Sequence, residues 1–377
     1  AWEQRKLGDI AAFSKGQGFS KSNLTDSGSP VILYGRLYTN YETQICKVDT
    51  FVKSSSCGVL SKGGEVIVPA SGETAEDIAV ASHVSLPGIL LGGDLNVVTP
   101  KDNLDSNFLA LFITFGNAHV ELSKRAQGKS VVHVRNGDLS QLNIKYPTQS
   151  EQILISNLFI KNDNLITLHQ RKLDALKKIK SALLEKMFPK DGSDIPEIRF
   201  TGFIEAWEQR KLSDVAEIIG GGTPDTNNPS YWDGDIDWYS PAELGEQIYT
   251  IGSRRRITKE GYKNSSAKLL PANKTILFTS RAGIGTTAIL CRSACTNQGF
   301  QSLVISDNTD LYFIYSMSSR IKDFAISKAS GSTFLEISGK QLATMSLFLP
   351  QLNEQRKIGQ YFKSLDNLIT LHQRKLN

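Results

Sequence analysis

An eleven-residue stretch, DNLITLHQRKL, occurs twice in this chain without a single difference, at Asp163–Leu173 and at Asp366–Leu376. Identity over that length does not arise by chance in a sequence of mixed composition, so the chain contains an internal duplication. A second exact repeat, AWEQRKL, occurs at Ala1–Leu7 and at Ala206–Leu212. The chain is therefore arranged as a variable half and a repeated segment, followed by a second variable half and a second copy of that segment.

The repeated segment predicts a long amphipathic helix. No Pro or Gly interrupts residues 150–188, so the helix can extend over about 55–60 Å. Its apolar residues recur mostly at steps of three and four, on one face: Leu165, Leu168, Leu173, Leu176, Ile179, Leu183 and Met187. A helix this long needs a partner along its length, and the second copy supplies one in a paired coiled coil. The alternative places two amphipathic helices on separate globular domains, but identical sequences favour equivalent environments.

The variable halves are expected to be mainly β. Residues 66–80 and 276–290 both have the pattern of a strand, a polar loop and a second strand. Two further helices are expected at 107–124 and at 309–328.

The fold class that follows is α+β with pseudo-twofold symmetry. We predict β-rich globular domains at residues 1–147 and 191–349. The helical segments between and after them are 148–190 and 350–377. Because the first AWEQRKL opens the chain and the second helix stops at residue 377, we expect both ends to be truncated relative to the complete repeat.

The bulk composition is that of a folded protein without a membrane or export signal. Hydrophobic residues make up 40% and charged residues 21%, and no apolar run approaches the roughly 20 residues of a membrane helix. The four cysteines are scattered, which indicates free thiols, so we expect the protein in the cytoplasm. The net charge is +5, and residues 151–190 hold eight Lys or Arg against four Asp or Glu. The variable halves are therefore nearly neutral.

No catalytic pattern is convincing. NPSY at 228–231 is similar to the NPPY loop of adenine methyltransferases, but no Gly-rich cofactor loop accompanies it, so we interpret it as a turn. GGGTP at 220–224 lacks the Walker lysine and the Rossmann spacing. DGDID at 233–237 has no partner lysine for a nuclease site and is interpreted as a solvated turn. The five histidines show no metal-ligand spacing. We predict that this chain catalyses no reaction and binds no metal.

Polar loops that contain Gly are the remaining candidates for a site, because their side chains suit base edges and phosphates and Gly permits close approach of the backbone. Each half contains such loops. In the first half the candidates are Lys15, Gln17, Lys21, Arg36, Ser71, Gln127, Lys129 and Ser130. In the second half they are Thr223, Tyr239, Ser240, Arg254–Arg256, Ser280, Arg281, Asn297, Gln298, Ser332 and Thr333. Any one of them alone is more simply a solvated loop residue, and their recurrence in both halves is the stronger signal.

Taken together, the two exact repeats, the GGGTP loop and the Pro-x-x-x-Glu-Gln start of each helix resemble the specificity subunit of Type I restriction–modification systems. The resemblance covers essentially the whole chain. It implies that each variable domain reads one half of a split, asymmetric site on double-stranded DNA. It also implies that the helices pair antiparallel, set the gap between the half-sites and dock two methyltransferase subunits, which recruit the restriction subunits. S-adenosylmethionine, ATP and Mg²⁺ would then belong to those partners, and the target base would be flipped into a partner's pocket.

One departure from the family pattern affects the first half. It has SKGQGFSKS at 14–22 in place of a GGGTP loop, so its DNA-contacting residues are less securely placed. The competing hypothesis is a coiled-coil adaptor that joins two β-rich protein-binding modules and does not bind DNA.

Overall fold

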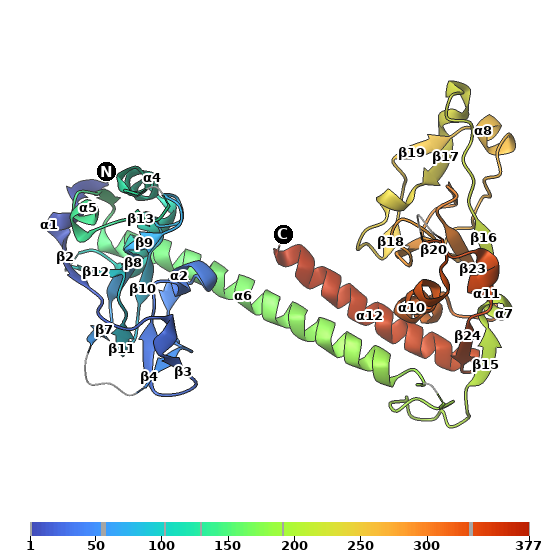
Figure 1. Cartoon of the computed structure of the whole chain (residues 1–377), viewed down its shortest axis with the longest axis horizontal. Coiled ribbons are helices and arrows are strands. Elements are labelled where there is room, and N and C mark those ends of the chain that lie inside the picture. The colour runs from blue at the N-terminus through green and yellow to red at the C-terminus, as the bar shows by residue number, and fades with distance from the viewer. Residues whose placement is uncertain are drawn as a thin grey trace. The chain divides into compact units, whose positions relative to one another are not determined.

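The computed structural model of the 377-residue chain describes residues 2–53, 58–101, 103–128, 130–190, 192–331 and 335–376. The chain divides into two compact units, which we call unit 1 (residues 1–168) and unit 2 (residues 169–377). The division lies inside one continuous helix, α6 (Gln149–Lys186). Each unit is described separately below (Figure 1).

Unit 1 is built on antiparallel and mixed sheets with short helices around them. Its strands are β1 (Glu3–Lys6), β2 (Ala11–Lys15), β3 (Leu24–Thr25), β4 (Ser29–Ile32), β5 (Gln44–Ile45), β6 (Phe51–Val52), β7 (Val59–Lys62), β8 (Glu65–Pro69), β9 (Ser71–Gly72), β10 (Ser82–Val84), β11 (Pro87–Leu91), β12 (Leu95–Pro100), β13 (Val132–His133) and β14 (Asn143–Tyr146). Its helices are α1 (Leu7–Ile10), η1 (Lys21–Asn23), α2 (Arg36–Thr39), α3 (Ser106–Phe115), α4 (Asn117–Arg125), α5 (Asn136–Ser140) and the first part of α6.

Unit 2 repeats this plan. Its strands are β15 (Glu208–Lys211), β16 (Ala216–Gly220), β17 (Trp232–Tyr239), β18 (Tyr249–Thr250), β19 (Arg255–Ile257), β20 (Thr275–Phe278), β21 (Thr287–Leu290), β22 (Ala294–Thr296), β23 (Gln301–Ile305) and β24 (Ser346–Leu349). Its helices are the rest of α6, α7 (Leu212–Val215), η2 (Pro229–Tyr231), η3 (Pro241–Glu243), α8 (Lys259–Lys263), α9 (Leu311–Ser316), α10 (Ser318–Lys328), α11 (Gly339–Ala343) and α12 (Leu352–Leu376).

The main sheets of the two units have the same topology. The strand order is β2-β12-β8-β10-β5 in unit 1 and β16-β23-β20-β21-β18 in unit 2. In each sheet the outer strand is the one that follows the AWEQRKL repeat. It pairs antiparallel with its neighbour, β2 with β12 in unit 1 and β16 with β23 in unit 2. A second sheet lies beside each main sheet, ordered β3-β6-β4-β11-β7 in unit 1 and β19-β17-β22 in unit 2. The predicted fold class, β-rich domains with two long helices, is confirmed.

The AWEQRKL repeat forms the strand that joins each domain to its helix. Its EQRK letters are β1 and β15, which pair antiparallel with β14 and β24, the strands directly before α6 and α12. The Leu that ends each repeat is fully buried, Leu7 in unit 1 and Leu212 in unit 2. The AWEQRKL repeat therefore lies where each domain passes into its helix.

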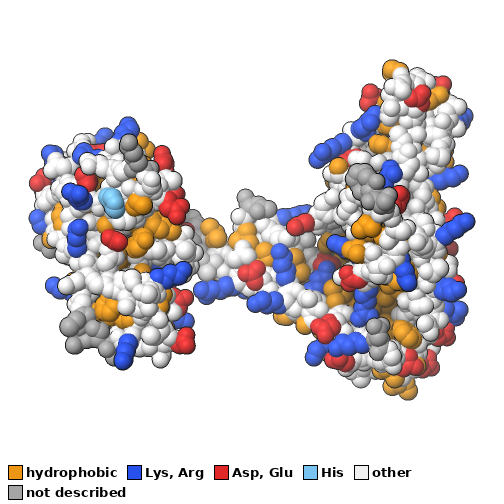
Figure 2. Space-filling model, viewed as in Figure 1, with side chains coloured by type: hydrophobic (Ala, Val, Ile, Leu, Met, Phe, Trp, Pro, Cys, Tyr) orange, Lys and Arg blue, Asp and Glu red, His pale blue; other side chains and the backbone are white. Residues whose placement is uncertain are grey.

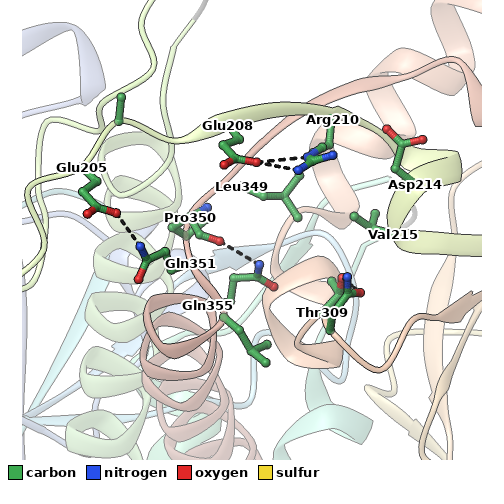
Figure 3. Close-up of a pocket in the computed structure, with 13 residues that line it drawn as sticks. Glu205, Glu208, Arg210, Asp214, Val215, Thr309, Leu349, Pro350, Gln351 and Gln355 are labelled. Carbon is green, nitrogen blue, oxygen red and sulfur yellow. Dashed lines mark hydrogen bonds and ion pairs between the residues drawn. The ribbon is translucent and has the colours of Figure 1, made fainter.

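The Gln of the Glu-Gln pair at each helix start also has a structural explanation. In unit 1 the buried Gln152 donates from Nε2 to the Pro147 carbonyl at 2.9 Å, and its Oε1 accepts from the Asp105 amide at 2.9 Å. In unit 2 Gln355 donates to the Pro350 carbonyl at 2.9 Å and accepts from the Asp310 amide at 3.0 Å. Figure 3 shows Gln355 directed at Pro350 beside a cavity of about 280 Å³. A buried amide needs partners for both its ends, so a glutamine at this position fixes the path of the chain into the helix.

Within unit 2 the end of α6 packs antiparallel on α12. Nδ1 of His169 lies 2.9 Å from Nδ1 of His372, and Nζ of Lys180 lies 2.6 Å from Oδ1 of Asp366. Further along, the ring of Phe188 lies 6.0 Å from that of Phe362. Rising numbers on one helix meet falling numbers on the other, which is the antiparallel arrangement. The two histidines at equivalent positions of the repeat therefore face each other across the helix pair.

Four sequence-based expectations need correction. The helix expected at 107–124 is broken at Gly116 between α3 and α4, and the one at 309–328 is broken at Met317 between α9 and α10. Within 66–80 only the two-residue strand β9 follows β8, and the strand that pairs with β8 in the main sheet, β10, begins at Ser82. DGDID is not a solvated turn, because it forms most of β17 and its Asp237 is 3% exposed.

Candidate nucleic-acid interface

The predicted polar loops of unit 2 meet at one end of its sheets. The Gly222 amide donates to the Thr296 carbonyl at 2.8 Å, and the Asn297 amide donates to the Tyr239 carbonyl at 2.9 Å. Oγ1 of Thr223 donates to Oε1 of Gln298 at 2.6 Å. The GGGTP loop, the end of β17 and the turn after β22 thus form one surface, although they are separated in sequence.

The loop that carries Arg281 adjoins this surface. The Ser280 amide donates to the Gly299 carbonyl at 2.8 Å, and the Ile337 amide donates to the Ser280 carbonyl at 3.1 Å. Ala282 has a φ of 51° and Gly283 a φ of 104°, so the chain turns sharply directly after Arg281. Within the described part of the chain, the structure shows no hydrogen bond or ion pair for the Arg281 guanidinium, which leaves its donors available to a ligand.

Unit 1 holds its loops in the same way. The Gln17 amide donates to the Leu91 carbonyl at 2.9 Å, which ties the loop after β2 to the end of β11. The Val134 amide donates to the Ala70 carbonyl at 3.1 Å, as Ile337 does to Ser280 in unit 2. Ser71 directly follows Ala70, and its Oγ lies 3.1 Å from Nδ1 of His133. Ser71 in unit 1 therefore takes the place of Arg281 in unit 2.

A glycine shows that SKGQGFSKS and GGGTP occupy the same structural position. A Cβ added to Gly16 would lie 1.9 Å from the Gly92 carbonyl oxygen, and a Cβ added to Gly221 would lie 1.9 Å from the Asn297 carbonyl oxygen. No other residue fits at either place. The two glycines are 205 residues apart, which is the offset of the AWEQRKL repeat. The first half therefore has a counterpart of the GGGTP loop, with Lys15 and Gln17 exposed on either side of Gly16.

Arg36 has a structural role in unit 1. Its side chain is 9% exposed and donates to Asp49 at 2.7 Å, Glu42 at 2.8 Å and the Lys47 carbonyl at 3.2 Å. Burial alone would lower its pKa, but the hydrogen bonds to Glu42 and Asp49 raise the pKa above its ordinary value. Because this guanidinium already has three partners within its own domain, we leave it out of the proposed interface.

Three candidates of unit 2 are also placed inside the fold. Tyr239 and Ser280 are buried. The Ser240 hydroxyl donates to Glu243 and caps the short helix η3. The backbone of these residues shapes the loops, while their side chains do not face solvent freely.

The other candidates are exposed or lie outside the described residues. Lys21, Gln127 and Ser130 are exposed in unit 1, whereas Lys129, Ser332 and Thr333 fall among the residues that the structure does not describe. Lys21 and Ser71 also line a cavity of about 950 Å³ whose walls include Tyr34, Tyr38 and Phe115. Exposed aromatic side chains beside polar loops suit stacking against nucleic-acid bases.

Sequence reasoning missed two residues of this region. His133 contacts Ser71, and its position is signalled only by the match of 127–133 with 330–336 at the repeat offset. Asp237 lies beside Arg256 and Arg292 and was hidden in a run of acids that resembles a turn.

The described residues contain no group of three or more His, Cys, Asp or Glu side chains placed to hold a metal ion. In the same residues, no helix is both long and apolar enough to cross a membrane.

The fold and the loops define a tandem protein, in which two copies of one β-rich module each carry a cluster of polar loops and lead into a helix. The chain belongs to the Type I restriction modification DNA specificity family, whose domain model matches residues 1–178 and again residues 204–377.

Individual relatives agree with this assignment. The Type I restriction enzyme MjaIX specificity subunit of Methanocaldococcus jannaschii is 37% identical over 171 residues, which are 43% of this chain and 38% of that protein. The chain thus spans about two fifths of that relative. The putative Type I restriction enzyme MjaX specificity subunit of the same organism is 24% identical over 99% of this chain and 89% of its own length. The crystal structure of the S subunit from M. genitalium has the same fold, with a TM-score of 0.63 at 15% identity over 100% of this chain and 92% of that one.

Proposed function

We propose that this chain is the DNA-recognition subunit of a Type I restriction–modification complex, in which unit 1 reads one half of a bipartite asymmetric site and unit 2 reads the other. One observation carries this proposal. The two units hold their polar loops with corresponding hydrogen bonds but place different side chains on them, such as Ser71 in unit 1 and Arg281 in unit 2. A common scaffold with different base-contacting groups is what two unlike half-sites require.

The repeated helices are proposed to dock two identical methyltransferase subunits. Leu165 and its counterpart Leu368 are 52% and 45% exposed, and Leu168 and its counterpart Leu371 are 45% and 47% exposed. Apolar residues that both copies leave exposed to the same degree mark a surface for a protein partner. Two copies of the surface suit two copies of one partner.

A pair of substitutions tests the docking surface. Leu368→Glu with Leu371→Glu should reduce the number of bound methyltransferase subunits from two to one, because the surface formed by Leu165 and Leu168 remains. Native mass spectrometry of the assembled complex measures this number, and Gln360→Glu is the control for an exposed change on the same helix. Retention of both subunits by the double variant would contradict docking on these leucines.

We further infer that methyl transfer, ATP hydrolysis and DNA cleavage belong to the partner subunits, which would bind S-adenosylmethionine, ATP and Mg²⁺. The support is the lack of a cofactor loop in the sequence. Methyl transfer to DNA by the purified chain alone would refute this inference.

The experiment for the function as a whole is DNA binding by the chain assembled with its methyltransferase subunits. A site-specific complex that weakens with salt supports the proposal. An assembled complex that shows no affinity for DNA would favour the adaptor hypothesis instead.

A further inference from the structure

Asp237 lies between two arginines on one face of the sheet β19-β17-β22. It is the cross-strand partner of Arg256 in β19 and of Ala294 in β22. Arg292 lies two residues before Ala294 in the sequence. Oδ1 of Asp237 lies 3.2 Å from Nε of Arg256, and Oδ2 lies 3.9 Å from Nε of Arg292. Oγ of Ser253 also donates to Oδ1 at 3.2 Å. The carboxylate thus holds a guanidinium on each side.

The charges of this group do not balance. Asp237 is 3% exposed, while the side chains of Arg256 and Arg292 are 46% and 59% exposed. A buried carboxylate requires a partner, and one arginine would meet that need. The second arginine leaves a net positive charge, and each guanidinium has five N–H donors of which one carboxylate can occupy only some. Nη1 of Arg292 also donates to the Ile251 carbonyl at 3.5 Å. The structure therefore holds two partly exposed cations beside one buried acid.

The neighbouring arginine is used differently. Arg255 pairs with Trp238 across the sheet and lies on the opposite face, where its guanidinium is 3.6 Å from the centre of the Trp232 ring. Lys and Arg side chains project from the lobe that carries β17 and β19 (Figure 2). The alternation along the strand thus separates a stacked arginine from the two that flank Asp237.

The arginine pair adjoins the polar loops of unit 2. Trp238, the next residue after Asp237, donates from Nε1 to the Gly222 carbonyl of the GGGTP loop at 2.9 Å. Tyr239 accepts from the Asn297 amide, and it follows Asp237 by about 7 Å along the strand. The strand that carries Asp237 thus leads into these loops, while the Trp238 indole that contacts them lies on the face opposite the Asp237 side chain.

Unit 1 shows that the fold itself does not require this group. The Gly92 amide donates to the Ile32 carbonyl in unit 1, as the Asn297 amide donates to the Tyr239 carbonyl in unit 2. Ile32 is therefore the counterpart of Tyr239. Two residues earlier on each strand, Pro30 is the counterpart of Asp237. Pro30 pairs across the sheet with Phe51, the counterpart of Arg256. The same place in unit 1 is therefore apolar.

We propose that Arg256 and Arg292, held by Asp237, form a clamp for one phosphate of the DNA backbone at the half-site that unit 2 reads. Guanidinium groups fixed in orientation match the oxygens of a phosphate. Asp237 is a positioning residue, which orients the two arginines without contacting DNA. The clamp rests on the proposed function and adds to it a contact that is independent of base sequence.

The test measures DNA binding by the chain assembled with its methyltransferase subunits, by fluorescence anisotropy over a series of salt concentrations. One duplex carries the recognition site and the other carries a scrambled site. Arg256→Ala and Arg292→Ala should each weaken binding to both duplexes by the same factor, about tenfold. Each should also reduce the slope of log affinity against log salt by about 0.9. Lys274→Ala is the control, since Lys274 is in the same unit but already paired with Asp307 at 2.6 Å.

Asp237→Asn separates geometry from charge. It adds one positive charge to the complex, so charge alone predicts tighter binding and a steeper salt dependence. A clamp predicts weaker binding to both duplexes, because the arginines lose their orientation. Thermal unfolding of each variant shows whether it is folded. If Asp237→Asn does not fold, the two arginine variants, which retain Asp237, still test the clamp.

Several results would overturn the clamp. Unchanged affinity and salt slope in both arginine variants would do so while DNA binding itself stands. A loss confined to the recognition-site duplex would mean that the arginines read bases. Tighter binding by a folded Asp237→Asn variant would assign the effect to charge alone. If the unaltered complex bound neither duplex, the proposed function would fail and the clamp with it.

Discussion

Arg281 and Ser71 show how one scaffold can carry two specificities. Arg281 follows Ser280, whose carbonyl accepts a hydrogen bond from the Ile337 amide. Ser71 follows Ala70, whose carbonyl accepts a hydrogen bond from the Val134 amide. The backbone positions match, while the side chains differ in length, charge and number of donors. At the scale of residues, a difference in recognition between the units requires no difference in fold.

Replacing Arg281 by Ala should weaken recognition of one half-site only. If its guanidinium contacts a guanine edge with two hydrogen bonds, the loss is about 1–3 kcal/mol and the preference at that base pair relaxes. Binding to duplexes in which each position of both half-sites is varied measures the effect. Arg210→Ala is the matched control, because Arg210 is exposed but paired with Glu208 at 2.7 Å. Equal losses on all duplexes would identify Arg281 as a phosphate contact instead.

Much of the element scale could be predicted from sequence because its signals are local. Apolar residues that recur every three or four positions predict α6. The strands β20 and β21 follow from their runs of β-forming residues. The break between α3 and α4 falls at Gly116, a residue that weakens a helix and could have signalled it, whereas the break at Met317 has no comparable signal in the sequence. The arginines beside Asp237 were visible as charges, but their common partner depends on strand register. Arg36 could be seen as a polar loop residue, whereas its pairing with Glu42 and Asp49 depends on the folded loop.

The histidine pair predicts a pH dependence for the packing of α6 on α12 in unit 2. Burial, with Lys375, His372 and Lys172 nearby, lowers the pKa of His169 below its ordinary 6.5. The folded state therefore favours the neutral ring, so its contribution to stability is present above about pH 6.5 and is lost as the pH falls. The unfolding midpoint should drop more on acidification in the unaltered chain than in the His169→Gln, His372→Gln variant. Parallel pH profiles for the two proteins would show that the pKa of His169 does not change on unfolding.

An insertion into α6 tests whether this helix sets the distance between half-sites. Asp163 accepts a hydrogen bond from Thr43 of unit 1, and His169 contacts His372 of α12. A segment added after Ile166 lies between these two contacts and spares both. Four helix-forming residues add about 6 Å and overshoot one turn by only about 40°. The preferred spacer should lengthen by roughly two base pairs, at about 3.4 Å each, with both half-sites unchanged.

Methylation-site sequencing measures the spacer of the insertion variant. Two inserted residues are the control, because they rotate the following part of the helix to its far side and should reduce activity more. An active four-residue variant with the original spacer would show that another feature sets the distance.

For the whole molecule, the proposed function gives the duplication a purpose, because one chain would then offer like surfaces to identical partners and unlike surfaces to DNA. The positive charge is concentrated in residues 151–190, with eight Lys or Arg against four Asp or Glu. Residues 1–147 and 191–349, outside the helical segments, are nearly neutral, so any phosphate contacts that they make depend on placed groups such as the proposed arginine pair rather than on a general basic surface.

The central claim is that each unit reads its own half-site independently of the other. Exchanging residues 8–146 for the corresponding segment of another family member tests it, because β1, the strand formed by EQRK, and helix α6 remain unaltered. Methylation-site sequencing in cells that contain the complete system gives both half-sites and the spacer. We expect one half-site to change to that of the donor, while the other half-site and the spacer stay the same. An active exchange variant in which both half-sites change, or neither does, would contradict the account.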